Sequence, residues 1–349
     1  MDGNTKLMSM SNKIIFIVGN SRSGTTMLGR ILGGHSNIHT FDELHFFEHE
    51  FDFNAQKDRP LWNKDRLLSL LERLFTTERE YEHFHAKVEQ GKYKSEAEKV
   101  ILLANSMSPL VVYQSFLNYE TINNRKIIPC EQTPRYLFFV KEILDAFPDA
   151  IVINMIRDPR DVLLSQKNKW RRRHLDSKRT PLVEMVRAWV NYHPYTITKL
   201  WVAAVRTAKR LEVNPKFKSI RFDDLLQQPE KIICELSEFI GIEFEKEMIN
   251  VSQIGSSTGS DSPEQKGVDP SRLGVWRKGG LSDVELSICQ SVSGKEMIRL
   301  NYLCEPVTVA VWRRWISMIG FLFKITIALL LNLRRTKNLY ETLRRRILA

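Results

Sequence analysis

The sequence predicts an α/β protein with a three-layer fold of the P-loop type, in which a parallel sheet is flanked by helices on both faces. Two observations lead to this prediction. A short β-rich run, Ile14–Val18, is followed by a glycine-bounded turn and then by a helical pattern. A second run, Ala150–Ile156, is almost continuously apolar, as expected for a parallel strand that is covered on both faces.

Further segments continue the alternation of strands and helices along the chain. Two more strands are expected at Lys126–Pro129 and Lys218–Phe222. Helical patterns separate the strands, and they span Tyr136–Phe147, Val162–Trp170, Leu182–Leu211 and Pro229–Ile240. Such an alternation is typical of a doubly wound sheet.

Three segments depart from this alternation. The charged and aromatic stretch from Phe51 to about residue 125 has leucines on a helical period, so it is expected to form a helical insertion over one end of the sheet. Residues Ser252–Pro270 are rich in Ser, Gly, Asp and Pro and are expected to form a mobile loop. We expect a catalytic domain over residues 1–306 and a basic, hydrophobic C-terminal tail over residues 307–349.

The composition excludes several protein classes. With 349 residues, 43% of them hydrophobic and 27% charged, the chain can bury a core, which excludes wholesale disorder. The four cysteines lie far apart without a CxxC pair, which argues against a disulfide framework or a thiolate zinc site. We see no cluster of His, Cys, Asp and Glu with metal-ligand spacing, so no metal is expected.

The positive charge is unevenly distributed. The net charge of the chain is +11, and the segment from Val307 onward has nine Lys and Arg residues and one Glu, a net charge of +8. The excess therefore belongs mostly to the tail. No nucleic-acid-binding motif surrounds it, so nucleic acid is not an expected partner.

The first motif is the run Gly19-Asn20-Ser21-Arg22-Ser23-Gly24-Thr25-Thr26. A turn that leaves a strand and opens a helix directs backbone N–H groups and the helix dipole toward one anion, so this run predicts a phosphate cradle. Its spacing matches the GxxxxGK[ST] loop, except that Thr25 stands where that loop has its lysine. Arg22 supplies a cation instead, and the two threonines add hydroxyl donors. The alternative is a Ser/Thr turn that caps a helix and binds nothing.

The second motif follows the buried strand Ala150–Ile156. The run Arg157-Asp158-Pro159-Arg160-Asp161-Val162-Leu163-Leu164-Ser165 places Arg157 at the carboxyl edge of the sheet, where α/β folds bind ligands. Ser165 lies two turns into the next helix. Taken alone, this run could equally be a charged loop with an Asp at the helix N-cap.

Together the two motifs resemble the sulfotransferases that use 3′-phosphoadenosine 5′-phosphosulfate (PAPS). The resemblance implies that the loop residues Arg22, Ser23, Gly24, Thr25 and Thr26 bind the 5′-phosphosulfate. It also implies that Arg157 and Ser165 bind the 3′-phosphate. The likeness runs from about Lys13 to Tyr302 and is nearest to the tyrosylprotein and carbohydrate sulfotransferases and their bacterial relatives.

Two further stretches carry the resemblance. Residues Glu131–Tyr136 are similar to the family's EKTPxY segment, but Gln132 replaces a lysine that is a candidate for stabilising charge on the leaving group. Residues Ser271–Lys278 are similar to its GxWR segment, and we expect Arg277 or Lys278 to meet a phosphate in a lid over the cofactor. The alternative is a packed Trp276 with exposed charges beside it.

Sulfuryl transfer requires a base that takes the proton of the acceptor. Relatives of the tyrosylprotein and carbohydrate type place a catalytic carboxylate in the segment that corresponds to His39–His45, and Glu43 occupies that position. Apolar neighbours are expected to raise its pKa. Asp42, His39 and His45 remain alternative bases.

The resemblance implies transfer of the sulfuryl group from PAPS to a hydroxyl or amine of a carbohydrate, lipid or small-molecule acceptor, without a metal. A P-loop kinase of a small metabolite is the alternative enzyme, although Thr25 in place of the loop lysine speaks against it. A membrane-tethered protein that binds nucleotide without turnover is the third hypothesis.

The tail has the features of a membrane-surface helix. Trp315–Leu333 is largely apolar, is flanked by arginines and carries a narrow polar stripe formed by Arg313, Ser317, Gly320 and Lys324. We expect it to lie in the bilayer interface, which would make the protein cytoplasmic and peripherally attached to a membrane. The alternatives are a helix packed on the catalytic domain or on a partner in a homodimer, and a true membrane span.

Overall fold

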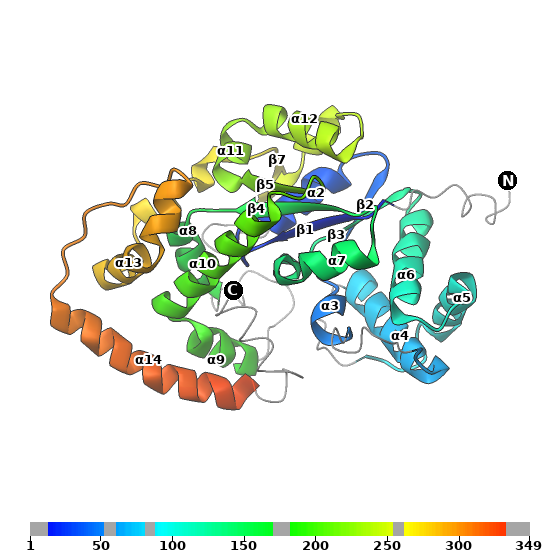
Figure 1. Ribbon diagram of the computed structural model, residues 1–349, viewed down its shortest axis with the longest axis horizontal. Coiled ribbons are helices and arrows are strands. Elements are labelled where there is room, and N and C mark those ends of the chain that lie inside the picture. Colours follow the sequence, from blue (N-terminus) through cyan, green and yellow to red (C-terminus); the bar gives the residue numbers. More distant parts are fainter. Residues whose placement is uncertain (1–12, 52–60, 81–87, 170–181, 254–261, 333–349) are drawn as a thin grey trace.

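The computed structural model describes residues 13–51, 61–80, 88–169, 182–253 and 262–332 (Figure 1). Its centre is a parallel five-stranded sheet with the strand order β2-β3-β1-β4-β5. The strands are β1 (Ile15–Gly19), β2 (Ile38–Phe41), β3 (Ile128–Glu131), β4 (Ile151–Ile156) and β5 (Phe217–Arg221). The predicted α/β fold with a parallel sheet is confirmed.

Strand β1 is central and fully buried, because β3 and β4 pair with it on its two sides. Since all the strands are parallel, their carboxyl ends meet at one edge of the sheet. The loop after β1, the segment after β2 and the start of the helix after β4 therefore lie along the same edge.

Helices cover both faces of the sheet (Figure 1). One face packs against α2 (Thr25–Gly33), α11 (Phe222–Gln227) and α12 (Pro229–Ile240). The other face packs against the 3₁₀-helix η2 (Pro134–Phe139), α7 (Val140–Ala146), α6 (Pro109–Asn123) and α10 (Pro194–Leu211). Alternate residues of β1 go to opposite sides, with Ile15 and Ile17 in the first core and Phe16 and Val18 in the second.

The stretch predicted as a helical insertion contains α4 (Lys64–Glu80), α5 (Lys94–Ala104) and α6, and the short helix α3 (Phe46–His49) precedes it. Aromatic rings join these helices to the sheet, and Phe46 stacks on Tyr113 with ring centroids 4.1 Å apart. These helices therefore share one apolar core with the second face of the sheet.

Two predicted helices are each divided in the structure. The segment Tyr136–Phe147 forms η2 followed by α7, and Leu182–Leu211 forms α9 (Leu182–Asn191) followed by α10. The second break has a local cause: Pro194 lacks an N–H group, and His193 before it is extended, with φ −150° and ψ 137°. Strand β2 was not predicted, because four residues of mixed polarity give little periodic signal.

The prediction of a loop over Ser252–Pro270 was wrong at both ends of that segment. Strands β6 (Ser252–Gln253) and β7 (Ser262–Lys266) pair antiparallel, and residues 254–261 lie outside the described ranges. Val251 and Val268 flank this pair and pack against the first core, which anchors it. The 3₁₀-helices η5 (Pro270–Arg272) and η6 (Val275–Lys278) follow.

Two long helices, α13 and α14, are the last elements of the described residues. Helix α8 (Pro159–Lys167) packs against α13 (Asp283–Arg299), and α14 (Val311–Asn332) packs against α9 and α13. Among the described residues, no single helix passes a length and hydropathy test for a membrane span, and the bent pair of α5 and α6 passes it only jointly. The basic run after Leu333 lies outside the described residues.

Candidate active site

The loop between β1 and α2 leaves the N-terminus of α2 open. Gly24 at the N-cap has a left-handed backbone with φ 97°, and no side chain caps the helix. A Cβ atom at Gly24 would lie 2.3 Å from the Phe222 ring, so only glycine fits there. The first backbone N–H groups of α2 have no acceptor within the helix, so they form a possible binding site for an anion.

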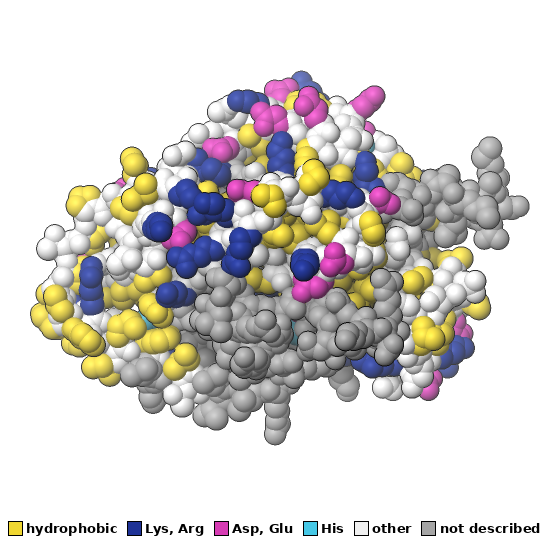
Figure 2. All heavy atoms as spheres, in the orientation of Figure 1, with side chains coloured by type: hydrophobic (Ala, Val, Ile, Leu, Met, Phe, Trp, Pro, Cys, Tyr) yellow, Lys and Arg dark blue, Asp and Glu magenta, His cyan; other side chains and the backbone are white. Residues whose placement is uncertain are grey.

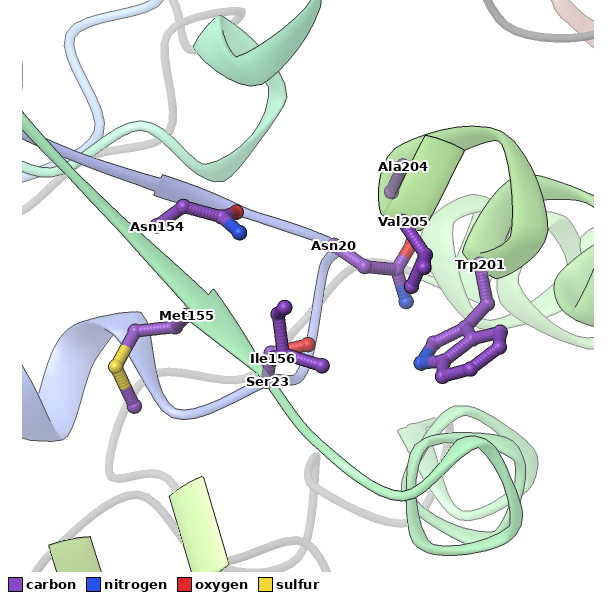
Figure 3. Close-up of a pocket in the computed structure, with 8 residues that line it drawn as sticks. All are labelled: Asn20, Ser23, Asn154, Met155, Ile156, Trp201, Ala204 and Val205. Carbon is purple, nitrogen blue, oxygen red and sulfur yellow. The ribbon is translucent and has the colours of Figure 1, made fainter. Parts of the chain in front are cut away.

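Side chains of the loop point toward β4 and α10. Figure 3 shows a small pocket where Asn20 and Ser23 lie near Ile156 of β4 and Trp201 of α10. Ser23 is fully buried, and its hydroxyl has no hydrogen-bond partner among the described residues. Thr25 is buried and Thr26 is exposed. A buried hydroxyl without a partner is costly, so the loop is suited to a ligand that accepts a hydrogen bond.

The two motifs of the sequence meet at the edge of the sheet. Arg22 Nε donates to Ser165 Oγ at 2.9 Å, and an Nη1 of Arg157 lies 3.5 Å from the Arg22 carbonyl oxygen. Arg22 has a left-handed backbone with φ 75°, which turns its side chain toward α8. The structure thus brings Arg22, Arg157 and Ser165 together.

Arg157 is a largely buried cation whose ion pair with the nearest carboxylate is long. Its side chain is 13% exposed, and its nearest carboxylate is Asp161, at 3.8 Å. The guanidinium stacks on Phe222 at 4.5 Å, and Trp201 Nε1 donates to the Arg157 carbonyl at 2.8 Å. Burial lowers the pKa of Arg157 and outweighs the nearby carboxylates. An anion at this position would restore the lost stabilisation.

The segment Gly274–Lys278 is attached to α8 by Asp161. The Asp161 carboxylate accepts the backbone N–H groups of Gly274 at 3.1 Å and of Trp276 at 3.0 Å. The Arg157 guanidinium also donates to the Arg272 carbonyl at 3.3 Å. This arrangement places the segment beside Arg157, and Asp161 was not singled out from the sequence because its partners are backbone groups more than a hundred residues away.

Arg277 and Lys278 have a different environment from the cation cluster. Arg277 Nε forms an exposed ion pair with Glu305 at 2.8 Å, and its guanidinium lies over the Trp276 ring at 4.7 Å. Lys278 is exposed. No contact within the described ranges joins either residue to Arg22 or Arg157, so the structure as it stands does not bring them to the phosphate sites.

Glu43 follows β2 at the same edge of the sheet and belongs to a charged cluster. Its carboxylate lies 3.3 Å from His45 Nε2, whose Nδ1 lies 2.8 Å from Glu48 Oε1. Arg135 pairs with Glu48 at 3.3 Å. The Glu43 side chain is 45% exposed, which leaves it accessible to an acceptor from solvent.

The expected rise in the pKa of Glu43 was wrong. Desolvation would raise its pKa, but the hydrogen bond and positive charge of His45 outweigh that effect and lower it. Burial lowers the pKa of His45, yet Glu43 and Glu48 raise it to about 9. Glu43 is therefore ionised at neutral pH and can accept a proton, whereas His45 is protonated and cannot.

The other alternative bases differ from Glu43 in their surroundings. Burial, followed by the charges of Glu78 and Glu43, raises the pKa of Asp42 to about 6. His39 Nε2 lies 3.2 Å from Glu78. The pKa of Asp42 is therefore close to the working range of a general base.

A carboxyl group that sequence reasoning missed lies beneath this cluster. Glu131 ends β3 and is fully buried; its Oε1 accepts from Thr133 Oγ1 at 2.5 Å and from the Leu44 N–H at 3.2 Å. Burial raises the pKa of Glu131 to about 8. Gln132 is buried beside Gly29 of α2, so it packs against the helix that follows the phosphate loop.

The statement that no His, Cys, Asp and Glu cluster has metal-ligand spacing was wrong. His45, Glu48 and His49 offer ligand atoms that lie within 4.8 Å of one another. The HxxEH spacing in the sequence would have revealed them. Glu43 and Glu48 raise the pKa of His45, so a metal at this cluster would have to displace the proton from the imidazole.

Comparisons with known proteins give a matching family model and similar folds. A family model described as "Sulfotransferase family" matches residues 15–246. A search of curated protein sequences finds no significant match. Among solved structures, the sulfotransferase domain from the curacin biosynthetic pathway has a TM-score of 0.51 at 20% identity, over 85% of this chain and 100% of that chain.

Two bacterial structures match less well. The sulfotransferase domain of the olefin synthase from Synechococcus PCC 7002 has a TM-score of 0.49 at 19% identity, over 82% of this chain and 95% of that chain. The sulfotransferase from Alicyclobacillus acidocaldarius has a TM-score of 0.39 at 17% identity, over 87% of this chain and 100% of that chain. At such identities, the likeness to the curacin-pathway domain concerns the fold.

Proposed function

The chain belongs to the sulfotransferase family, a family of PAPS-dependent enzymes, and from this premise we propose that it transfers the sulfuryl group of PAPS to a hydroxyl or amine of an acceptor. We propose Glu43 as the general base. The observation that carries the proposal is the meeting of Arg22, Arg157 and Ser165 beside the open N-terminus of α2.

The residues at this edge fit the two anionic ends of PAPS. The uncapped N–H groups of α2 and the buried Ser23 hydroxyl would hold the 5′-phosphosulfate. Arg157, a buried cation whose Nε has no partner among the described residues, would hold the 3′-phosphate together with Ser165. Phe222 under the Arg157 guanidinium fixes the orientation of that cation.

Glu43 suits the role of the base because it is ionised, accessible and held in place. His45 lowers the pKa of Glu43, so the carboxylate is ready to take a proton at neutral pH. A lower pKa also makes it a weaker base, and proximity to the acceptor must offset that weakness. Glu48 and Arg135 continue the ion-pair network behind His45, which keeps the imidazolium oriented toward Glu43.

The negative charge that develops on the leaving group must be stabilised without the family's lysine, because Gln132 stands in its place. Gln132 is buried beside α2 and offers a hydrogen bond but no charge. Arg22 is a cation within the loop itself, and its guanidinium donates to Ser165 of α8. We propose that Arg22 supplies this charge.

The test is to incubate the purified protein with PAPS or with ATP and a mixture of hydroxyl and amine acceptors. A sulfotransferase releases adenosine 3′,5′-bisphosphate and adds one sulfo group to an acceptor, which mass spectrometry detects. A P-loop kinase would instead release ADP. A nucleotide-binding protein without turnover would bind PAPS and release neither product, and either of these outcomes would overturn the proposal.

A further inference from the structure

Helix α14 contacts the rest of the protein through its polar side. Lys324 Nζ donates to the Tyr192 carbonyl at 3.3 Å and lies 4.3 Å from the Trp189 ring. Trp189 belongs to α9, and Tyr192 directly follows that helix. His193 Nδ1 accepts the Tyr195 N–H, so Nε2 carries the proton that it donates to the Ser317 carbonyl at 3.3 Å. The polar stripe predicted from the sequence thus points toward the domain at Ser317 and Lys324.

Two more contacts fix the rotation of α14 about its axis. The Phe321 ring lies 4.6 Å from the His193 ring, and Arg314 donates to the Ser287 hydroxyl of α13. Arg314, Ser317, Phe321 and Lys324 are spaced by three or four residues and therefore share one helix face. The helix cannot turn this face away from the domain without breaking contacts to both α9 and α13.

The opposite face of α14 is apolar and open to solvent. Its exposed side chains, with exposures of 59% to 68%, are Val311, Trp312, Trp315, Ile316 and Ile319. Trp312, Trp315, Ile316 and Ile319 follow the i, i+3, i+4, i+7 pattern of a single apolar stripe. Figure 2 shows hydrophobic side chains gathered at the end of the molecule where Figure 1 places α14. This is the reverse of a surface helix in a water-soluble fold, which turns its apolar stripe inward.

The segment that contains this face is basic in sequence. The segment from Val307 onward carries a net charge of +8, and Arg313 is exposed within α14. Helix α10 exposes four further basic side chains, Lys199, Arg206, Lys209 and Arg210. In Figure 2, Lys and Arg side chains gather over the region that α10 occupies in Figure 1.

We propose that the outer face of α14 docks the protein on an anionic lipid bilayer. Charge complementarity selects this occupant: a second copy would bring two segments of net charge +8 together, whereas anionic headgroups attract them. Two exposed tryptophans suit the headgroup level of a bilayer, where amphipathic rings gather. Since the contacts at Ser317 and Lys324 already hold the opposite face against the domain, docking needs no rearrangement of α14.

The inference predicts a defined orientation of the docked enzyme. Tyr192, whose carbonyl accepts from Lys324, donates its hydroxyl to Glu285 Oε1 at 2.6 Å, and Lys167 donates to Glu285 Oε2 at 2.7 Å. Lys167 is the last residue of α8, the helix that carries Ser165. A continuous series of contacts therefore joins the docking helix to the helix of the cofactor site.

The experiment is co-sedimentation of the full chain with vesicles of phosphatidylcholine alone or mixed with phosphatidylserine. We compare the wild type with Trp315→Glu/Ile319→Glu, and with the control Leu102→Glu/Leu103→Glu, which adds the same two charges at exposed apolar residues of α5 (77% and 41% exposed) at the other end of the molecule. The wild type and the control should bind the anionic vesicles, and less tightly at high salt. The double variant should bind at least tenfold more weakly.

Several outcomes would overturn the inference. Equal binding by the double variant and the wild type would remove α14 from the contact, and equal binding to neutral vesicles would remove the role of charge. If the wild type is a dimer that the double variant dissociates, a second copy covers the face instead. Should the double variant unfold, hydrogen exchange of wild-type residues 311–319 gives the answer, because docking must slow it when anionic vesicles are added. All these readouts are independent of sulfuryl transfer.

Discussion

Replacement of Arg157 by alanine tests the assignment of the 3′-phosphate site. Arg157 is 13% exposed, its nearest carboxylate is 3.8 Å away, and the two carbonyl groups near it lie at 3.3 and 3.5 Å, which are long hydrogen bonds. Most of its hydrogen-bonding capacity is therefore available to an anion. Loss of a charged hydrogen bond to a phosphate costs about 2 kcal/mol, which corresponds to ~30-fold weaker binding.

Calorimetric titration with two ligands measures this effect. Arg157→Ala should bind PAPS ~30-fold more weakly. It should bind adenosine 5′-phosphosulfate, which lacks the 3′-phosphate, almost as the wild type does. Arg157→Lys keeps the charge but loses the planar group over Phe222, so we expect an intermediate affinity for PAPS.

Two controls separate ligand binding from stability and net charge. Thermal unfolding shows whether Arg157→Ala keeps the fold, since Arg157 also contacts the Arg272 carbonyl. Lys209→Ala removes one positive charge from an exposed side chain of α10 and should leave PAPS affinity unchanged. Equal losses of affinity for PAPS and adenosine 5′-phosphosulfate in Arg157→Ala would refute the reasoning.

Three further predictions concern the carboxyl groups. Glu43→Gln should lower turnover by about 10²–10⁴ with PAPS affinity retained. Because His45 lowers the pKa of Glu43, the pH profile of the wild-type kcat/KM should not fall on the acid side near pH 6. A fall near pH 6 would identify Asp42 as the base, since its pKa is about 6. Asp161→Asn should weaken PAPS binding by about tenfold, since one of the two N–H groups that Asp161 holds loses its acceptor; unchanged affinity in calorimetry would contradict this. Glu131 has a folded pKa of about 8, above its unfolded value, so it stabilises the fold at low pH and that contribution is lost as the pH rises toward 8. The urea midpoint should therefore fall less between pH 6 and pH 8.5 in Glu131→Gln than in the wild type, and equal falls would contradict the burial argument.

The fold was predictable where the signal is local. A buried parallel strand reads as a continuous apolar run, and the turn Gly19–Thr26 contains its own glycines and hydroxyls. The break of Leu182–Leu211 was also readable, because Pro194 stands within the helical pattern. Strand β2 was not, because its four residues owe their conformation to pairing with β3, which is distant in the sequence.

The positions of the candidate anion-binding residues were predictable from the sequence, and their supporting contacts were not. Arg157 and Ser165 are eight residues apart on a strand edge and the following helix, so their positions follow from the secondary structure. Phe222 under Arg157 and the backbone partners of Asp161 come from other parts of the chain. The pKa of Glu43 depends on the side-chain geometry of His45, which no sequence pattern fixes.

A crystal structure with adenosine 3′,5′-bisphosphate tests the central claim most directly. The account predicts the 5′-phosphate at the backbone N–H groups that open α2, within hydrogen-bond distance of Ser23 and Thr25. It predicts the 3′-phosphate between the guanidinium of Arg157 and the hydroxyl of Ser165. A complex with the 3′-phosphate away from Arg157, or with the nucleotide outside this edge of the sheet, would contradict the account.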